Sequence, residues 1–208
     1  MPLPIYHITP IDNLESIIAQ SGLLAYNVML ETKTNYTNIA YENIQDRRAR
    51  IRVPCGAGGV LHDYIPFYFA PRSPMLYTIN RGNVKSYSQG QSTVIHLVSS
   101  VENIDAAGLS FVFTDGHAVM AFTEFFDDLN DLGAIDWDVM ESRYWNDTNE
   151  DNDRKRRRQA EFLVRNFFPW QLITEIGVIN STIKSQAENF LQNFTHKPSV
   201  IVRKNWYY

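Results

Sequence analysis

The chain has 208 residues, of which 44% are hydrophobic and 20% are charged, as is typical of one soluble globular domain with a sizeable core. No apolar run approaches the length of a membrane span, and the first residues lack the basic and apolar regions of a secretory signal. The only cysteine, Cys55, excludes an internal disulfide. We therefore expect a single domain over residues 1–208, with no membrane association, in the cytoplasm.

The formal net charge of -4 conceals a strong asymmetry along the chain. Residues 124–153 contain 11 of the 23 acidic residues and a single base, Arg143, whereas the rest of the chain has 18 bases and 12 acids. The acidic stretch ends where five consecutive basic residues begin, and these are Arg154, Lys155, Arg156, Arg157 and Arg158. A mildly acidic overall charge therefore does not exclude nucleic acid as a partner.

In the first half of the chain, residues 4–8 read as a short strand. Asp12 is expected to cap a helix, with Glu15 completing a capping box and Gly22 ending the helix. Residues 27–53 are polar and are expected to be irregular or weakly helical. A strand is predicted over residues 65–69, followed by a short helical piece near residues 73–82.

In the second half, strands are predicted over residues 93–98 and 109–114. Asp115 and Gly116 are expected to turn the chain into a helix with Val119, Phe122, Phe126 and Leu129 on one side. Residues 130–153 read as a long functional loop with helical patches. Strands follow at 160–164, 174–179 and 199–203, with a helix capped by Ser181 before the last. Short strands and irregularly spaced helices favour an α+β fold.

Several common chemistries lack a signature. The glycines of residues 56–59 do not have the spacing of a dinucleotide-binding or P-loop motif, and no GxSxG is present. None of the five histidines, His7, His62, His96, His117 and His196, pairs with another His or Cys at ligand spacing, so we expect no metal.

Glu161 is the most suggestive single residue. It follows the basic residues 154–158 and opens the apolar run of residues 162–164. A carboxylate at the mouth of a buried strand, reached through a cationic segment, suits chemistry on an anionic substrate. The simpler interpretation is a solvated basic helix whose glutamate pairs with a neighbouring arginine. A second basic cluster contains Arg47, Arg48, Arg50 and Arg52.

Four blocks carry a resemblance to a known family: YHITPIDNLESIIAQSGLL (6–24), IRVPCGAGGVLHDYIPFYFAPRSPMLY (51–77), FTDGHA (113–118) and DRKRRRQAEFLVRNFFPWQLI (153–173). In this order they resemble the DarT-type DNA ADP-ribosyltransferase toxins, whose antidote is a macrodomain protein. The resemblance implies an ADP-ribosyltransferase fold, a split pair of small β-sheets with flanking helices around an NAD cleft. It also implies transfer of ADP-ribose from NAD to a thymine ring nitrogen in single-stranded DNA, by a chain that we expect to be monomeric.

The resemblance also implies site residues. Glu161 matches the family's catalytic glutamate and Arg52 its essential arginine. Residues from about 35 to 53 would cover NAD, and residues 116–161 would form the substrate-recognition loop, with His117 in a supporting role. The positions expected near NAD are His7, Ile8, Thr9, Ser16, Leu24 and Arg52. Those expected to contact DNA are Arg154, Lys155, Arg156, Arg157, Arg158, Tyr144 and Trp145.

The implied chemistry agrees with these residue types. Cleavage of the glycosidic bond of NAD creates an oxocarbenium-like centre, which a carboxylate stabilises. Arg52 would polarise the thymine, hold the NAD phosphates or assist removal of the proton, and because an arginine normally stays charged and is a poor base, no one of these roles is assigned to it. Two alternatives remain open at this point. One is an NAD-dependent RNA 2′-phosphotransferase, whose extra His and Arg positions are not found here. The other is a non-catalytic single-strand-binding module.

Overall fold

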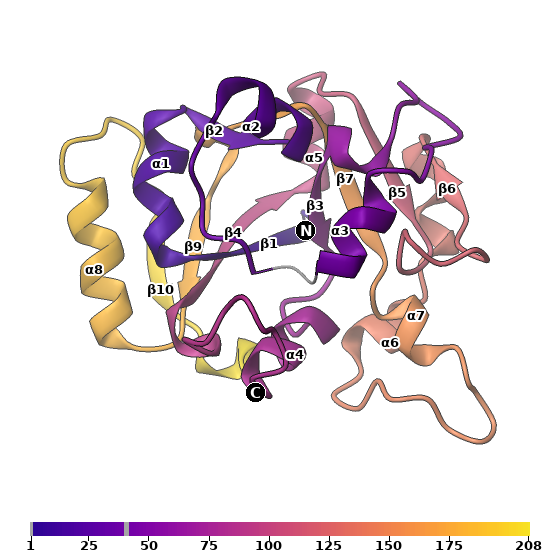
Figure 1. Ribbon diagram of the computed structural model, residues 1–208. Helices are drawn as coiled ribbons and strands as arrows, with labels where there is room; N and C mark the ends of the chain where they lie inside the picture. Colours follow the sequence, from indigo (N-terminus) through magenta and orange to yellow (C-terminus); the bar gives the residue numbers. More distant parts are fainter. Residues whose placement is uncertain (1, 40–41) are drawn as a thin grey trace.

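The structure, a computed structural model, describes residues 2–39 and 42–208. It contains one large mixed sheet and one small sheet, with helices around them (Figure 1). The strands of the large sheet are, in spatial order, β10 (Ser199–Val202), β9 (Glu175–Val178), β4 (Val94–Ser100), β1 (Pro4–Pro10), β3 (Tyr64–Tyr68), β7 (Glu161–Arg165), β5 (Phe111–Thr114) and β6 (Phe125–Phe126). The small sheet pairs β2 (Gly22–Leu24) with β8 (Phe167–Pro169). The expected α+β class is confirmed.

The large sheet is almost divided between β1 and β3. Strand β1 pairs with β4 along its whole length, but it pairs with β3 only at Tyr6 and Tyr68. Pro66 lacks an N–H, and its carbonyl oxygen lies 2.9 Å from Nδ1 of His7. Because the N–H and C=O of a residue in an antiparallel ladder point to the same neighbour, Pro66 cannot continue the pairing toward β1. The sheet therefore separates here into two halves, as expected for a split-sheet fold.

Helices surround this sheet on different sides (Figure 1). At the end formed by β9 and β10, α1 (Leu14–Ala19) contacts α8 (Ser181–Leu191). The helix α3 (Glu42–Arg48) crosses in front of the central strands, and the short helices α6 (Trp137–Glu141) and α7 (Arg154–Arg157) lie below β7. The remaining helices are α2 (Tyr26–Thr32), α4 (Pro74–Asn80) and α5 (Val101–Ala106).

Aromatic packing holds the small sheet against the large sheet. Phe67, Phe113, Phe162 and Phe168 are all fully buried in the main core. The ring centroids of Phe67 and Phe168 lie 4.9 Å apart, which joins the central strand β3 to the small sheet. Offset and edge-to-face aromatic pairs of this kind add to the free energy gained from burial. The small sheet is thus fixed against the large sheet where the pairing of β1 with β3 is lost.

The predicted helix after Asp115 is wrong. Residues 115–124 instead form hydrogen-bonded turns that lead into β6. The carboxylate of Asp115 accepts a hydrogen bond from the N–H of Glu124 at 2.8 Å, and the hydroxyl of Thr123 donates to the carbonyl of His117 at 2.8 Å. Such local side-chain bonds to the backbone compete with helix formation. Phe122, which the helical pattern placed on a buried side, is 82% exposed.

Three predicted helix boundaries also need correction. The side chain of Asp12 makes no capping bond, because the chain passes through a 3-10 turn over Ile11–Asn13 before α1 begins. That helix ends before Ser21, which adopts a left-handed conformation with a φ of 60°, and Gly22 lies in β2. Asn180, not Ser181, caps α8, its side-chain oxygen accepting from the N–H of Ile183 at 3.0 Å.

Within the described part of the chain, no helix combines the length and apolar character needed to cross a bilayer.

Gly177 on β9 provides a test of the core packing. A Cβ built there lies 2.2 Å from Cζ3 of Trp206, whose ring is held in turn against Tyr6 with centroids 5.2 Å apart. We expect Gly177→Ala to lower the free energy of unfolding in urea by about 1–3 kcal/mol, because the tryptophan must shift. Gly133→Ala is the matched control, since a Cβ there meets nothing within 4 Å. Equal stability of the two variants would contradict the packing.

Candidate active site

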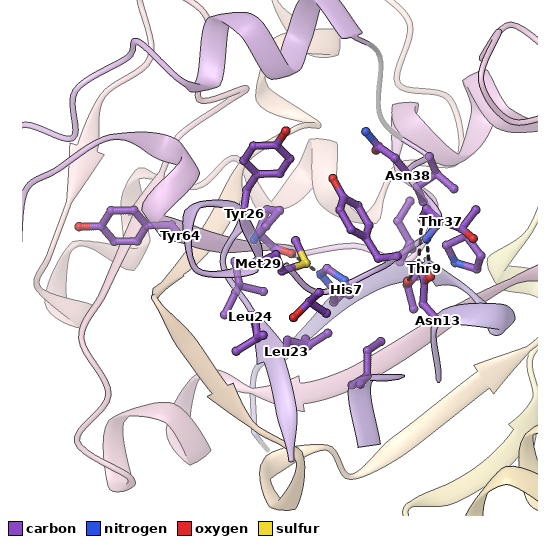
Figure 2. Close-up of a pocket in the computed structure, with 18 of the residues that line it drawn as sticks. His7, Thr9, Asn13, Leu23, Leu24, Tyr26, Met29, Thr37, Asn38 and Tyr64 are labelled. Carbon is purple, nitrogen blue, oxygen red and sulfur yellow. Dashed lines mark hydrogen bonds between the residues drawn. The ribbon is translucent and has the colours of Figure 1, made fainter. Parts of the chain in front are cut away.

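The principal pocket opens where β1 and β3 separate. Both strands line it, together with α1, β2, α2, residues 34–39 and the inner side of α3. Figure 2 shows labelled side chains from β1, β2, α2, β3 and residues 37–38 around this pocket, with His7 near its centre. Five of the six positions expected near NAD line this pocket, and these are His7, Ile8, Thr9, Ser16 and Leu24. Pockets at a break in a sheet are common ligand sites because backbone and side-chain polar groups converge there.

His7 has a fixed orientation in the pocket. Its Nδ1 lies 2.9 Å from the carbonyl oxygen of Pro66, which can only accept, so Nδ1 carries the proton. Burial lowers the pKa of His7, with the bond to Pro66 acting weakly in the opposite direction. The imidazole is therefore neutral near pH 7, and its Nε2 is left as a hydrogen-bond acceptor.

Asn13 ties the segment that covers the pocket to the end of β1. Its side-chain amide donates to the hydroxyl of Thr9 at 3.0 Å and to the carbonyl of Thr37 at 2.9 Å. Its side-chain oxygen accepts from the N–H of Thr37 at 2.6 Å (Figure 2). The two bonds to Thr37 hold one point of the expected NAD-covering segment against the pocket. Residues 40 and 41 of that segment lie outside the described residues.

A buried ion pair lies at the inner end of α3. Nη1 of Arg48 donates to Oε2 of Glu161 at 2.7 Å, and both side chains are less than one-tenth exposed. Oε1 of Glu161 accepts from the N–H of Ala118 at 3.1 Å. Nη2 of Arg48 is buried and has no hydrogen-bond partner among the described residues. Because an unpaired buried donor is costly, this nitrogen is suited to a ligand in the pocket that Arg48 lines.

Three elements position Glu161. It begins β7, and its N–H donates to the hydroxyl of Thr114 at the end of the neighbouring strand β5 at 3.0 Å. Tyr68 of β3 stands directly opposite Glu161 in the ladder and lines the pocket. Burial, and next the negative charge of Glu161, raise the pKa of Tyr68, so its phenol stays protonated. Directly opposed residues share one face of a sheet, so Tyr68 lies beside Glu161, which does not itself line the pocket.

His117 lies beside the ion pair. Burial lowers its pKa, and the positive charges of Arg48, Arg47 and Lys155 add to that effect, against the opposing charge of Glu161. Its backbone N–H donates to the carbonyl of Arg156 at 3.0 Å. Arg47, the residue before Arg48, donates to the carbonyl of Val119. The helix α3 therefore contacts both the carboxylate and the segment that presents His117.

The structure does not bring Arg52 to the site. Arg52 is exposed, forms an isolated bridge with Val60 and does not line the pocket. The arginine that contacts Glu161 is Arg48. Gln45 and Arg48 are three residues apart on α3, and both face the pocket. Because α3 ends at Arg48, the chain turns away before Arg52 can continue this face.

The basic residues 154–158 are not a free phosphate-binding run. Arg156 pairs with Asp115 and Asp153, both within 3 Å. Arg157 pairs with Asp136 and Asp151. Thus acids of the segment 124–153 and its flank neutralise these two arginines.

The other members of the run differ among themselves. Arg154 donates to the carbonyl of Tyr144 at 2.9 Å, and Arg158 is buried with its guanidinium on backbone carbonyls. Lys155 is exposed, and its side chain forms no ion pair within residues 2–39 and 42–208. Of the two aromatic residues expected to stack on DNA, Tyr144 is 74% exposed but Trp145 is buried. All seven expected DNA contacts stay predictions, and Lys155 and Tyr144 are the two most exposed of these side chains.

Sequence reasoning missed Arg48, Asn13 and Tyr68 as site residues. Arg48 was visible only as one member of a basic cluster, and Asn13 followed a residue that resembled a helix cap. Tyr68 lay in an aromatic run that also reads as core. The one available signal was helical spacing: Arg48 lies three residues after Gln45, on the same face of a helix, whereas Arg52 lies beyond the end of that helix.

The chain is similar to known DNA ADP-ribosyltransferases. A sequence model of the family described as "ssDNA thymidine ADP-ribosyltransferase, DarT" matches residues 6–208. The DNA ADP-ribosyl transferase of Thermus sp. (strain 2.9) is 47% identical over 209 residues, which cover 100% of this chain and 97% of that protein. A DNA ADP-ribosyl transferase–DNA ADP-ribosyl glycohydrolase fusion protein of Thermosipho africanus is 25% identical over 193 residues, covering 91% of this chain and 46% of the fusion.

Solved structures of the Thermus sp. 2.9 protein are also similar. Its complex with ADP-ribosylated single-stranded DNA superposes with a TM-score of 0.93 at 46% identity, over 100% of this chain and 97% of that chain. Its complex with NAD+ has a TM-score of 0.88 at 43% identity, over 100% and 98%. None of these relatives is a 2′-phosphotransferase or a non-catalytic binding protein. The chain belongs to the DarT family of single-stranded-DNA thymidine ADP-ribosyltransferases.

Proposed function

We propose that NAD+ binds in the pocket between β1 and β3, and that Glu161, held by Arg48 and the N–H of Ala118, carries the transfer of ADP-ribose to thymidine in single-stranded DNA. The observation that supports this assignment is the buried carboxylate of Glu161, which pairs with the pocket-lining Arg48 and accepts a hydrogen bond from the N–H of Ala118. The Thermus sp. 2.9 protein has been solved in complex with NAD+ and in complex with ADP-ribosylated single-stranded DNA. The likeness of the two folds extends this pairing of substrates to the present chain.

The residues of the pocket fit NAD+. Its walls include apolar side chains such as Leu23, Leu24 and Met29, which suit the flat rings of a dinucleotide. The Nε2 of His7 is an acceptor, and Nη2 of Arg48 is a buried donor that has no partner among the described residues. A buried cation of this kind matches the negative charge of the NAD+ phosphates.

Glu161 stabilises the positive charge that develops on the ribose. NAD+ supplies the electrophilic ribose carbon, and nicotinamide leaves with the electron pair of the broken glycosidic bond. A carboxylate beside that carbon lowers the barrier because the attraction grows as the charge develops. Until the substrates bind, Arg48 compensates the buried charge of Glu161.

His117 accepts the proton that the thymine nitrogen loses. The nitrogen forms a bond to the ribose carbon, and its proton must move to a base. Burial keeps the imidazole of His117 neutral near pH 7, so it has a free lone pair. Arg48 stays charged and therefore polarises the reacting groups and does not remove the proton.

A partner that removes ADP-ribose from DNA completes the proposed function. The Thermosipho africanus relative joins the names of a transferase and a DNA ADP-ribosyl glycohydrolase in one chain. We infer that a separate macrodomain antitoxin of this activity reverses the modification made by the present chain, which acts as the toxin. The monomeric state and the cytoplasmic location of the present chain remain predictions.

Glu161→Gln should lower transfer of label from NAD+ to a thymidine-containing oligonucleotide by at least 10²–10³-fold, on the order of the effect of removing one stabilising group. The amide keeps the size of the side chain and an oxygen for the N–H of Ala118, but it carries no negative charge. Glu175→Gln is the matched control, because Glu175 lies on β9, pairs with Arg203 and does not line the pocket. Wild-type turnover by a folded Glu161→Gln protein would overturn the assignment.

The contributions of Arg48 and Arg52 to transfer can be distinguished by making the same substitution, to lysine, at each position. Arg48→Lys should lower transfer by roughly 10²-fold, because lysine cannot contact Glu161 and a ligand with two fixed nitrogens. Arg52→Lys should leave transfer near the wild-type rate, since Arg52 is exposed and outside the pocket. Label transfer and thermal melting of both variants provide the measurement. Loss of activity in Arg52→Lys alone would restore the role that the sequence assigned to it.

The pH dependence of transfer tests His117. Its pKa in the folded protein lies below 6.5, so the neutral imidazole persists as the pH falls through 6.5 and is lost only below it. We therefore expect the acidic limb of the pH–rate profile to lie below pH 6.5. In His117→Gln this limb should disappear, and the plateau should fall by about 10²–10⁴-fold. An unchanged limb in the variant would assign it to another group.

A further inference from the structure

Arg72 is an unusual cation next to the site. It lies between β3 and α4, half-buried, with its guanidinium carbon 4.4 Å from the centre of the Tyr208 ring. Its Nε is buried and has no hydrogen-bond partner among the described residues. The side chain is therefore held in place by stacking on an aromatic ring and not by a carboxylate.

A second arginine reinforces this positive charge. The guanidinium of Arg158 donates to the carbonyl oxygens of Arg72 at 3.0 Å and of Val139 at 2.7 Å. Burial lowers the pKa of Arg158, and the nearby charge of Arg72 lowers it further, against the opposing effect of Tyr208. Within residues 2–39 and 42–208, neither arginine forms an ion pair. Carbonyls satisfy the hydrogen bonds of Arg158 but leave both positive charges without a counter-charge.

Two further aromatic side chains pack around the Tyr208 ring on which Arg72 stacks. Tyr77, which is 39% exposed, has its ring centre 5.0 Å from that of Tyr208 and 5.8 Å from that of Trp145. The indole N–H of Trp145 donates to the hydroxyl of Tyr208 at 2.9 Å, and that hydroxyl lies 3.1 Å from the carbonyl oxygen of Arg72. These four residues, Arg72, Tyr77, Trp145 and Tyr208, are called the Arg72 subsite below.

The Arg72 subsite includes or adjoins residues of both the pocket and the expected substrate-recognition segment 116–161. Met75, three residues after Arg72, lines the NAD+ pocket, and Trp145 belongs to the expected substrate-recognition segment 116–161. The buried Arg158 lies three residues before Glu161. Short stretches of chain therefore connect the Arg72 subsite with the pocket, through Met75, and with Glu161, through Arg158, whose guanidinium contacts the carbonyl of Arg72.

We propose that Arg72 binds a phosphodiester group of the single-stranded DNA close to the target thymidine, with the exposed ring of Tyr77 available to an adjacent base; this inference rests on the proposed function. Single-strand binding combines a cation for the backbone with an aromatic surface for bases, and the Arg72 subsite contains both. The basic run of residues 154–158 has more cations, but its members Arg156 and Arg157 are already neutralised by aspartates. The phosphate contact lies at Arg72 because its charge has no internal partner.

The test is the affinity for a thymidine-containing oligonucleotide, measured against salt concentration. Arg72→Gln should weaken binding on the order of tenfold and lower the slope of log affinity against log salt by about 0.7, the value for one phosphate on a single strand. The affinity for NAD+ and the melting temperature should not change. Arg81→Gln is the matched control, because Arg81 is exposed at the other end of α4 and forms no ion pair with the described residues.

Oligonucleotides with one neutral methylphosphonate linkage locate the contact. In wild-type protein, the neutral linkage at one position near the target thymidine should weaken binding of the oligonucleotide. In Arg72→Gln, the neutral linkage at the same position should not lower the affinity further. Wild-type affinity and salt slope in Arg72→Gln would overturn the inference. So would an equal effect of the neutral linkage in both proteins, or a combined loss of NAD+ affinity and melting temperature, which would indicate a structural role. If the wild-type protein bound no oligonucleotide, both the proposed function and the Arg72 inference would be wrong. If Arg72→Gln left both transfer and binding intact, only the Arg72 inference would be wrong.

Discussion

A buried arginine and a buried glutamate meet at 2.7 Å where α3 crosses the start of β7. Moving two charges out of water is costly, and their attraction offsets that cost only when the remaining polar atoms also find partners. The N–H of Ala118 supplies one such partner, whereas Nη2 of Arg48 has none among the described residues. The pair therefore requires α3, β7 and residues 115–124 to meet at one place, and it leaves one donor for a ligand.

The break between β1 and β3 provides that ligand with space. A continuous antiparallel ladder would close the pocket, because each strand would satisfy the backbone of the other. Pro66 removes one donor, and His7 uses the remaining carbonyl. The cavity then needs a cover, which residues 34–39 and α3 provide, with Asn13 fixing Thr37. One proline and one histidine thus connect the topology of the sheet with the position of the candidate active site.

The distribution of charge along the chain has a structural purpose as well as a functional one. Asp115, Asp136, Asp151 and Asp153 neutralise Arg156 and Arg157, so the acidic segment folds onto the basic run that follows it. Partly buried ion pairs of this kind orient a long segment that has little regular secondary structure. Two arginines of the basic run are therefore neutralised within the chain, whereas Arg72, outside that run, forms no ion pair with the described residues.

The amino-acid sequence by itself determined the fold class, most strands of the large sheet and the position of Glu161 at the start of a buried strand, because period-two apolar patterns and the order of the matching blocks are local properties of the chain. The pocket positions His7, Ile8, Thr9, Ser16 and Leu24 followed from the same blocks. Tertiary structure alone decided which arginine contacts Glu161: α3 ends at Arg48, so Arg52 leaves the inward face although it carries the same charge. It also decided which cations are neutralised, since an ion pair depends on the distance between residues far apart in the sequence.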